Sequence, residues 1–332
     1  MKNLRIAFFD AKPYDRRVFT EVNKKYNFET KYFETHLNED TATLARNFDA
    51  VCVFVNDKIT KSVIDTLAEG VTRLIALRCA GYNNIDIRAA KDRLRVCRVP
   101  EYSPYAIAEH TIGLMLCLNR HIHKAYARSR EHNFSINGLM GSDFHGKTAG
   151  VIGTGRIGQC VISILRGIGM RILAHDLAEN KDFARQNKVE YVELSELLVA
   201  SDVVSLHCPL TPKTRYIISD TTIDQMKDGV MLINTGRGGL IQTAALIDGL
   251  KQGKIGSAAL DVYEEEEEYF FEDRSEEIMD DELLSRLLTF PNVLVTSHQG
   301  FFTREAMHNI ADTTFGNISE FFNRGQLPNG VC

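Results

Sequence analysis

The chain has 332 residues, of which 44% are hydrophobic and 25% are charged, and its formal net charge at pH 7 is −5. This length predicts two domains, and the lack of a basic block argues against nucleic acid as the main partner. No apolar run is long enough to span a membrane, and Met1-Lys-Asn-Leu-Arg leads directly into a predicted strand, so we expect neither a membrane anchor nor a signal peptide. The seven scattered cysteines contain no Cys-x-x-Cys pair, which indicates reduced thiols in the cytoplasm.

The first hundred residues alternate between strand-like and helix-like segments, which predicts a parallel sheet covered on both faces. Strands are expected at Leu4–Phe9, Ala50–Val55, Leu74–Leu77 and Val96–Val99, with helices at Tyr14–Lys25 and Thr60–Glu69. Pro100 and Pro104 then bracket a break, after which Tyr105–Leu118 reads as a long apolar helix.

A second series of the same kind starts at Lys147. Its further strands are expected at Met170–Ala174, Tyr191–Val192, Val203–Leu206, Val230–Asn234, Ser257–Val262 and Asn292–Thr296. The sequence therefore predicts two Rossmann-like or flavodoxin-like α/β domains, with the cofactor domain at 102–299. The helical segment Arg304–Arg324 could return to the first domain, which would then be discontinuous, at 1–101 and 300–332.

The segment Val151-Ile-Gly-Thr-Gly-Arg-Ile-Gly158 joins a predicted strand to a predicted helix. This is the glycine fingerprint of dinucleotide-binding folds in its expected setting. Gly153 would permit the tight turn, Gly155 would let the backbone approach a pyrophosphate, and Gly158 would let the helix pack closely on the strand. Asp176, at the end of the next strand, would accept hydrogen bonds from the adenosine ribose and repel a 2′-phosphate. We therefore predict NAD as the cofactor.

Ligands of open α/β sheets bind beyond the carboxyl ends of the strands, and polar residues follow three of the predicted strands. Arg237 lies between glycines and could hold a carboxylate through two parallel hydrogen bonds, although a surface ion pair is the alternative. His298 could exchange a proton near neutral pH, although a single histidine is more often structural. His121 and His123 read as one polar stripe on a helix, and His207 is given no chemical role.

An acidic segment follows the predicted strand that ends at Val262. Residues 264–282 contain twelve acids and one base, Arg274, which is typical of a solvated surface. Because the expected substrate is an anion, at most one or two of these acids should face it. A carboxylate beside His298 would favour the charged imidazole. The pattern does not say which of the five consecutive glutamates, Glu264 to Glu268, takes that place.

The whole chain resembles the NAD-dependent D-2-hydroxyacid dehydrogenases, and among them most closely the bacterial fermentative D-lactate branch. The matching segments are Ala76-Leu-Arg-Cys-Ala-Gly81-Tyr-Asn-Asn-Ile-Asp86, Val99-Pro-Glu-Tyr102-Ser-Pro, Ala108-Glu-His110, the glycine fingerprint, Ser205-Leu-His-Cys-Pro-Leu-Thr-Pro212, Asn234-Thr-Gly-Arg237-Gly, Leu260-Asp-Val-Tyr-Glu264 and Phe270-Phe-Glu-Asp273. Two positions depart from the family pattern. Gly236 stands where Ser is frequent, and Ser297 stands where Pro is common.

The resemblance implies an active site in the cleft between the two domains, and it assigns a role to each matching position. The catalytic groups would be Arg237, Glu266 and His298. The cofactor contacts would be Gly153, Gly155, Arg156, Ile157, Gly158, Asp176, Cys208, Pro209, Thr214, Thr235, Gly236 and Asp261. The substrate would meet Phe54, Cys79, Ala80, Gly81, Tyr102, Arg237 and Phe301. No metal is expected, because the nicotinamide supplies the redox chemistry.

The activity that the resemblance implies is the reversible reduction of pyruvate to D-lactate by NADH, as in fermentation. Other D-2-hydroxyacid dehydrogenases remain open, such as glyoxylate/hydroxypyruvate or branched-chain 2-ketoacid reductases, whereas few spare cations are present for a phosphoglycerate. A protein of another class, an NAD-sensing binding protein without catalysis, also remains open. The expected assembly is a cytoplasmic homodimer or homotetramer.

Overall fold

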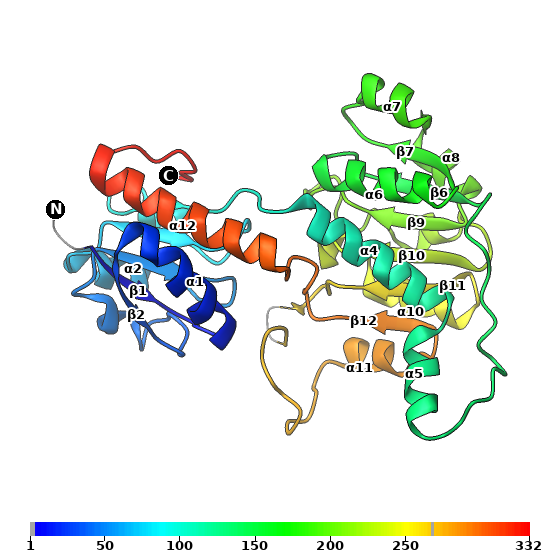
Figure 1. Cartoon of the computed structure of the whole chain (residues 1–332), viewed down its shortest axis with the longest axis horizontal. Helices are drawn as coiled ribbons and strands as arrows, with labels where there is room; N and C mark the ends of the chain where they lie inside the picture. Colours follow the sequence, from blue (N-terminus) through cyan, green and yellow to red (C-terminus); the bar gives the residue numbers. More distant parts are fainter. Residues whose placement is uncertain (1–3, 267–268) are drawn as a thin grey trace. The chain divides into compact units, whose positions relative to one another are not determined.

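The computed structural model describes residues 4–266 and 269–332, so Glu267 and Glu268 of the glutamate run lie outside the described residues. The chain divides into two compact units. Unit 1 comprises Met1–Ser103 together with Phe302–Cys332, and unit 2 comprises Pro104–Phe301. Each unit is built around its own parallel sheet (Figure 1).

Unit 1 contains a five-stranded sheet in the order β2-β1-β3-β4-β5, and every pairing is parallel. Its strands are β1 (Arg5–Phe8), β2 (Glu29–Tyr32), β3 (Ala50–Val53), β4 (Leu74–Leu77) and β5 (Arg95–Cys97). The central strands β3 and β4 are buried along their whole length, as expected where helices cover both faces of a parallel sheet.

The helices of unit 1 are α1 (Pro13–Tyr26), α2 (Lys61–Glu69), α3 (Ile87–Ala90) and α12 (Arg304–Arg324), with a short 3-10 turn, η1 (Ala42–Ala45). The last helix returns to the unit from the far end of the sequence and packs beside α1, where the rings of Phe19 and Phe315 lie 5.2 Å apart (Figure 1). It starts at Thr303, whose side chain accepts the N–H of Ala306, and it ends at Gly325 in the left-handed conformation.

Unit 2 contains a seven-stranded parallel sheet in the order β12-β11-β10-β9-β6-β7-β8. Its strands are β6 (Thr148–Ile152), β7 (Arg171–His175), β8 (Val189–Tyr191), β9 (Val203–Leu206), β10 (Val230–Asn234), β11 (Ile255–Leu260) and β12 (Val293–Val295). The strand order reverses at β6, where β9 lies on one side and β7 on the other. The prediction of two parallel-sheet α/β domains is confirmed.

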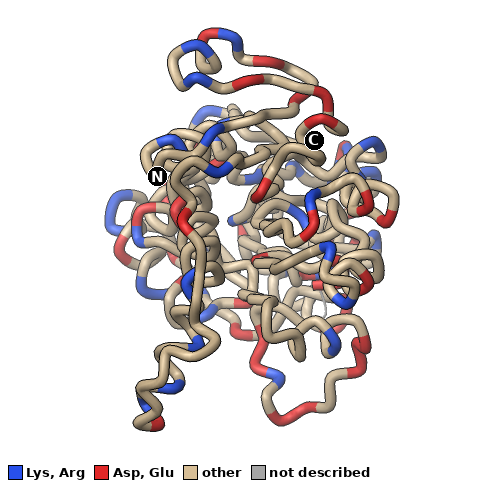
Figure 2. Tube along the Cα trace, turned by 90° about the vertical axis from the view of Figure 1, so that its right-hand side faces the viewer, with Lys and Arg blue, Asp and Glu red and all other residues tan. Residues whose placement is uncertain are grey.

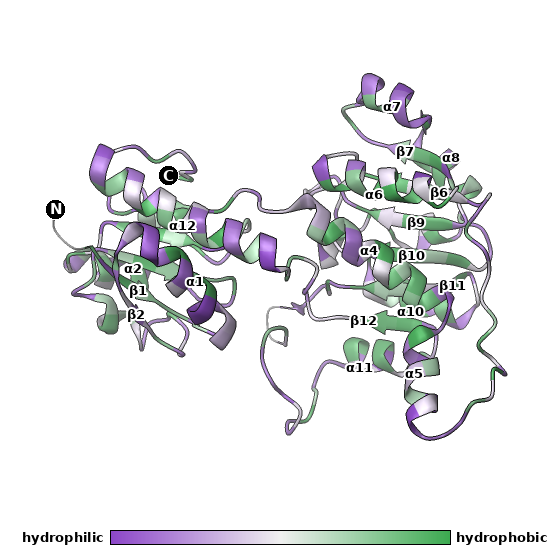
Figure 3. Cartoon of the chain, in the orientation of Figure 1, coloured by the Kyte–Doolittle hydropathy of each residue, from purple (hydrophilic) through white to green (hydrophobic). Residues whose placement is uncertain are grey.

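Helices cover both faces of this sheet, and each face has its own apolar core. The strands are largely green, the colour of hydrophobic residues, in Figure 3. The helices are α4 (Pro104–Asn119), α5 (Ile122–Arg130), α6 (Arg156–Gly167), α7 (Lys181–Asn187), α8 (Leu194–Ala200), α9 (Asp220–Ile223), α10 (Thr243–Lys251) and α11 (Glu282–Thr289), with a 3-10 turn, η2 (Gly238–Leu240).

One detail of the sequence analysis is wrong. His121 has a φ of +50° and lies in the turn that separates α4 from α5, so it does not share a helical stripe with His123. The left-handed turn allows the chain to change direction between the two helices.

Acidic and basic residues are interspersed along the chain rather than gathered into one basic stretch (Figure 2). Among the described residues, none of the helices combines the length and the apolar character that crossing a lipid bilayer requires.

Candidate active site

The glycine fingerprint forms the turn between β6 and α6, and each of its glycines is needed for a different physical reason. Gly153 has a φ of +94°, and a Cβ there would lie 2.4 Å from the backbone nitrogen of Cys208. A Cβ on Gly158 would lie 2.1 Å from the carbonyl oxygen of Gly153. By contrast, a Cβ on Gly155, which caps α6, would meet open space. The first and third glycines therefore close the turn, while the second leaves its outer side accessible.

Asp176 follows β7, and its carboxylate faces the same turn. One oxygen accepts the backbone N–H and the hydroxyl of Thr154, at 2.5 and 2.9 Å, and the other accepts the N–H of Ala178 at 3.0 Å. Burial opposes the charge of this carboxylate, but the hydrogen bonds outweigh it and hold the pKa of Asp176 below its usual range. The group is therefore ionised at neutral pH.

These features fit a dinucleotide. Gly155 is open on its outer side and precedes α6, a helix of 12 residues. This position suits a pyrophosphate, because the N–H groups and dipole of the helix favour negative charge there. The Asp176 carboxylate follows β7, the strand next to β6, where the ribose attached to such a pyrophosphate would lie. Arg156 and Ile157 are the first two residues of α6.

The loop after β9 closes the other side of this turn. The Thr214 hydroxyl donates to the carbonyl of Pro209 at 2.6 Å, which holds residues 209–214 in a compact loop. Burial raises the pKa of Cys208 to about 11, so its thiol stays neutral. Burial also lowers the pKa of His207 to about 4, so this imidazole is a neutral hydrogen-bond partner of Ser205 rather than a proton donor.

Arg237 lies in the loop that follows β10. The Asn234 side chain closes this loop, since its amide donates to the carbonyl of Arg237 and its oxygen accepts the N–H of Gly236. Thr235 is buried and shares a 2.8 Å hydroxyl contact with Thr111 of α4. The Arg237 guanidinium is exposed, and within the described residues it donates to the carbonyl of Gly236. Its planar edge is therefore available for a carboxylate.

His298 follows β12 and pairs with Glu266. Its Nδ1 lies 2.8 Å from Oε1 of Glu266, whose other oxygen accepts the N–H of Tyr263. His298 has a φ of +54°, a conformation that is uncommon for a residue with a side chain and that often occurs at functional sites. Because Nδ1 faces the carboxylate, Nε2 is the nitrogen that can meet a substrate.

Asp261, at the end of β11, fixes the turn that carries His298. Its carboxylate is 1% exposed and accepts the backbone N–H groups of Gln299 and Gly300 at 2.9 and 2.8 Å. His110 of α4 and the Thr296 hydroxyl donate to the same carboxylate. The Asp261 carbonyl also accepts the N–H of His298. Burial opposes its charge, but these donors hold the pKa of Asp261 below its usual range.

Two glutamates of the acidic run have partners outside the run. Glu266 faces His298, whereas Glu264 accepts hydrogen bonds from the hydroxyls of Thr243 and Tyr216. Glu264 therefore ties the segment after β11 to the start of α10. The two carboxylates, although only two positions apart, have different partners.

The residues expected to meet the substrate are spread over both units. Phe54, Cys79, Ala80, Gly81 and Tyr102 belong to unit 1, and Phe301 is the last residue of unit 2. Within unit 1, Phe54 follows β3 and the Cys79–Gly81 loop follows β4, the adjacent strand. Arg98 holds this loop by donating to the carbonyl of Ala80 at 2.7 Å.

The residues of unit 2 have the architecture of a nicotinamide-dependent dehydrogenase, and comparison with known proteins gives the family. Residues 112–300 match the family model of the D-isomer specific 2-hydroxyacid dehydrogenase, NAD binding domain. A protein of Schizosaccharomyces pombe named 2-hydroxyacid dehydrogenase homolog 1 is 50% identical over 99% of both chains. D-lactate dehydrogenase of Escherichia coli is 47% identical over 98% of this chain and 99% of the relative.

Solved structures agree with this assignment. The apo-structure of D-lactate dehydrogenase from Escherichia coli superposes with a TM-score of 0.92 at 45% identity, covering 99% of this chain and 100% of the other. The structure described as the pyruvate reductase of Chlamydomonas reinhardtii gives a TM-score of 0.95 at 44% identity, covering 98% of each chain. The chain therefore belongs to the NAD-dependent D-2-hydroxyacid dehydrogenases, and the predictions of an enzyme and of NAD as its cofactor are confirmed.

Several residues that build the site were missed in the sequence analysis. His110, Thr111 and Thr296 received no role, although all three donate or share hydrogen bonds with site residues. The available signal was the presence of polar side chains inside an otherwise apolar helix and at a strand end, since buried polar groups require partners.

The Asp261 hub leads to a prediction about stability. Because the folded pKa of Asp261 is depressed, its stabilisation is present above the unfolded value of 3.8 and is lost as the pH falls through the folded value. Asp261→Asn would turn an amide N–H₂ toward backbone donors, and we expect it to lower the free energy of unfolding by about 2 kcal/mol at pH 7. Urea denaturation from pH 7 to pH 3 checks this.

The difference between Asp261→Asn and wild type should shrink below pH 4. A difference that stays constant over that range would contradict the role given to the charge. Asp224→Asn, which changes an exposed aspartate of the same unit, is the matched control and should leave the unfolding free energy nearly unchanged.

Proposed function

We propose that the enzyme is a D-lactate dehydrogenase, which reduces pyruvate to D-lactate with NADH and catalyses the reverse reaction. The observation that carries this proposal is the arrangement of Arg237, Glu266 and His298 after three consecutive strands of one sheet, β10, β11 and β12. A carboxylate clamp and a carboxylate-paired imidazole are the groups that a 2-keto acid requires. The similarity to D-lactate dehydrogenases over nearly the full chain supports the choice of substrate.

In the proposed reaction, Arg237 binds the substrate carboxylate through two parallel hydrogen bonds and so orients the ketone. NADH, when bound, supplies the hydride that reaches the carbonyl carbon. As the carbonyl π electrons move onto oxygen, Nε2–H of His298 donates its proton to that oxygen, and the alcohol forms. Glu266 accepts the Nδ1–H throughout, which keeps the ring oriented and stabilises its protonated form. In the reverse direction, neutral Nε2 accepts the hydroxyl proton.

Unit 1 is proposed to contribute the rest of the substrate site. The backbone N–H groups of the Cys79–Gly81 loop would bind the substrate carboxylate, and Phe54, Tyr102 and Phe301 would surround the methyl group. Two phenylalanines leave room for a methyl more readily than for a branched chain. We therefore propose pyruvate rather than 2-ketoisocaproate as the better substrate.

Following the loss of NADH absorbance with pyruvate tests the proposal. We expect His298→Gln to bind NADH normally, as measured by the change in NADH fluorescence on binding, while turnover falls about 10²- to 10⁴-fold, since general acid catalysis is lost. His132→Gln, in an exposed loop of the same unit, is the control. Near-normal turnover of His298→Gln would remove this residue from the mechanism, and faster reduction of 2-ketoisocaproate than of pyruvate would defeat the lactate assignment.

Glu266 and Glu264 can be separated by pH dependence. Because Glu266 stabilises the protonated imidazole, Glu266→Gln should move the alkaline limb of the pH–rate profile of pyruvate reduction to lower pH. Glu264→Gln, whose carboxylate contacts Thr243 and Tyr216 instead, should leave this limb where it is in the wild type. An unshifted limb in Glu266→Gln would show that another group charges the histidine.

We also propose that the enzyme is a cytoplasmic homodimer or homotetramer. None of its seven cysteines forms a disulfide, which favours a reducing compartment. Large apolar side chains are exposed on α4, α5 and the loop after them, and a second copy could cover them: Tyr105, Ile122, Tyr126, Phe134, Ile136 and Met140. Ile136→Asp should lower the molar mass in light scattering, whereas Ile278→Asp, which changes another exposed isoleucine in the acidic segment, should not. An unchanged mass in Ile136→Asp would place the interface elsewhere.

A further inference from the structure

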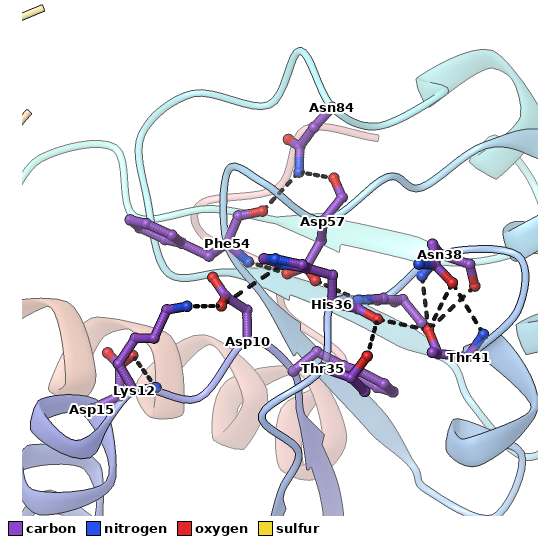
Figure 4. A network of polar contacts seen from close by, with 12 residues as sticks. Asp10, Lys12, Asp15, Thr35, His36, Asn38, Thr41, Phe54, Asp57 and Asn84 are labelled. Atoms are coloured by element: carbon purple, nitrogen blue, oxygen red, sulfur yellow. Dashed lines mark hydrogen bonds and ion pairs between the residues drawn. The ribbon is translucent and has the colours of Figure 1, made fainter. Parts of the chain in front are cut away.

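The backbone of Phe54 is fixed on both sides by side chains that the proposed mechanism does not use. The Asp57 carboxylate accepts the N–H of Phe54 with one oxygen and the N–H of Leu37 with the other, both at 2.6 Å. The Asn84 amide donates to the carbonyl of Phe54 at 2.8 Å and to the carbonyl of Asp57 at 2.9 Å. Figure 4 shows these contacts converging on Phe54 from Asp57 and Asn84.

The ring of Phe54 is fixed as well, by Arg78. The Arg78 guanidinium lies 4.8 Å from the centroid of the Phe54 ring, a cation–π distance, and its side chain is 3% exposed. Its nitrogens donate to the carbonyls of Phe9 and Asp10 at 3.1 and 2.7 Å. The Asp15 carboxylate lies 3.6 Å away. Because these partners fix the guanidinium, the Phe54 ring packs against a group that has one position and one orientation.

Stability does not explain why charged groups surround Phe54. Buried charges pay a large desolvation penalty, and well-packed apolar side chains often stabilise a protein as well or better. What the charged groups add is directional: two hydrogen bonds fix the peptide units on both sides of Phe54, and the planar guanidinium fixes the ring. Phe54 is also tied, through Asn84, to the end of the loop that begins with Cys79.

We propose that Asp57, Asn84 and Arg78 are positioning residues that hold Phe54 rigid as the wall limiting the length of the 2-keto acid side chain. The inference rests on the proposed function, because it takes Phe54 as part of the substrate site. A longer side chain can be admitted only if Phe54 moves. A rotation of the ring breaks its contact with Arg78, and a shift of the backbone breaks the hydrogen bonds to Asp57 and Asn84. Discrimination against longer substrates therefore depends on these three residues as well as on the volume of Phe54.

Asp57→Asn tests the proposal, because the amide can still accept one of the two backbone N–H groups but cannot accept both. The measurement is kcat/KM for pyruvate divided by kcat/KM for 2-ketobutyrate, which is longer by one methylene. We expect this ratio to fall about tenfold, which is the size of a one-methylene discrimination in a rigid pocket. The change should lie mainly in KM, and the Kd of NADH should be unchanged.

Asp49→Asn is the matched control. Asp49 is also a buried carboxylate of unit 1 that accepts a backbone N–H, that of Arg5, but it precedes β3, whereas Asp57 follows it. Both substitutions should lower the melting temperature, and only Asp57→Asn should change the substrate ratio. A fall in the rates with both substrates by the same factor in Asp57→Asn would show a purely structural role and overturn the proposal.

A double-mutant cycle shows whether Asp57 acts through Phe54. In a Phe54→Leu background the wall is already removed, so Asp57→Asn should have no further effect on the ratio. The same ratio change in both backgrounds would also overturn the proposal. If Asp57→Asn fails to fold, Asn84→Ala, which releases the carbonyl of Phe54 without disturbing a charge, enters the cycle in its place.

The failure of the proposed function can be distinguished from the failure of this inference. If the wild-type enzyme prefers a 2-keto acid other than pyruvate, the lactate assignment fails. The same cycle is then run with the preferred acid and its homologue that is longer by one methylene. A lower ratio of the two kcat/KM values in Asp57→Asn would support the inference, and an unchanged ratio would overturn it.

Discussion

The site of unit 2 depends on one buried carboxylate, that of Asp261. It receives donors from residues 296–300, which follow β12, and from α4, so a single ionised group joins the end of β11 to these two segments. Removing such a carboxylate from water is expensive, and only several hydrogen bonds make the burial acceptable. These hydrogen bonds hold the left-handed turn at His298 in one conformation, so the imidazole is already oriented toward Glu266.

The arrangement of strands explains why the proposed catalytic groups can be far apart in the sequence. In a parallel sheet the carboxyl ends of neighbouring strands lie at one edge, and the loops that follow them are adjacent. Arg237, Glu266 and His298 follow three neighbouring strands for this reason. Each loop is closed by its own hydrogen bonds, so the sheet sets the rough positions of the groups and the local contacts set their orientation.

Strong periodicity made most of the fold predictable, and weak periodicity explains what was missed. The bounds of β4, β9, β10 and α12 agree with the sequence analysis, because each is a buried apolar strand or a capped amphipathic helix. The edge strand β2 was missed, since Glu-Thr-Lys-Tyr is largely polar and half exposed. The choice between Glu264 and Glu266 could not be made from the residues alone, because identical neighbours carry no pattern. Only the path of the chain after β11 separates them.

The return of α12 to unit 1 has a consequence for biosynthesis. Because Phe315 packs on Phe19, the ribosome must complete all of unit 2 before the first helix of the protein can meet its partner. Unit 2 is continuous in sequence and can form its sheet during elongation, whereas the nascent amino-terminal unit keeps an apolar surface uncovered until translation is almost finished. That interval is when the chain is most exposed to aggregation and when a chaperone would protect it most.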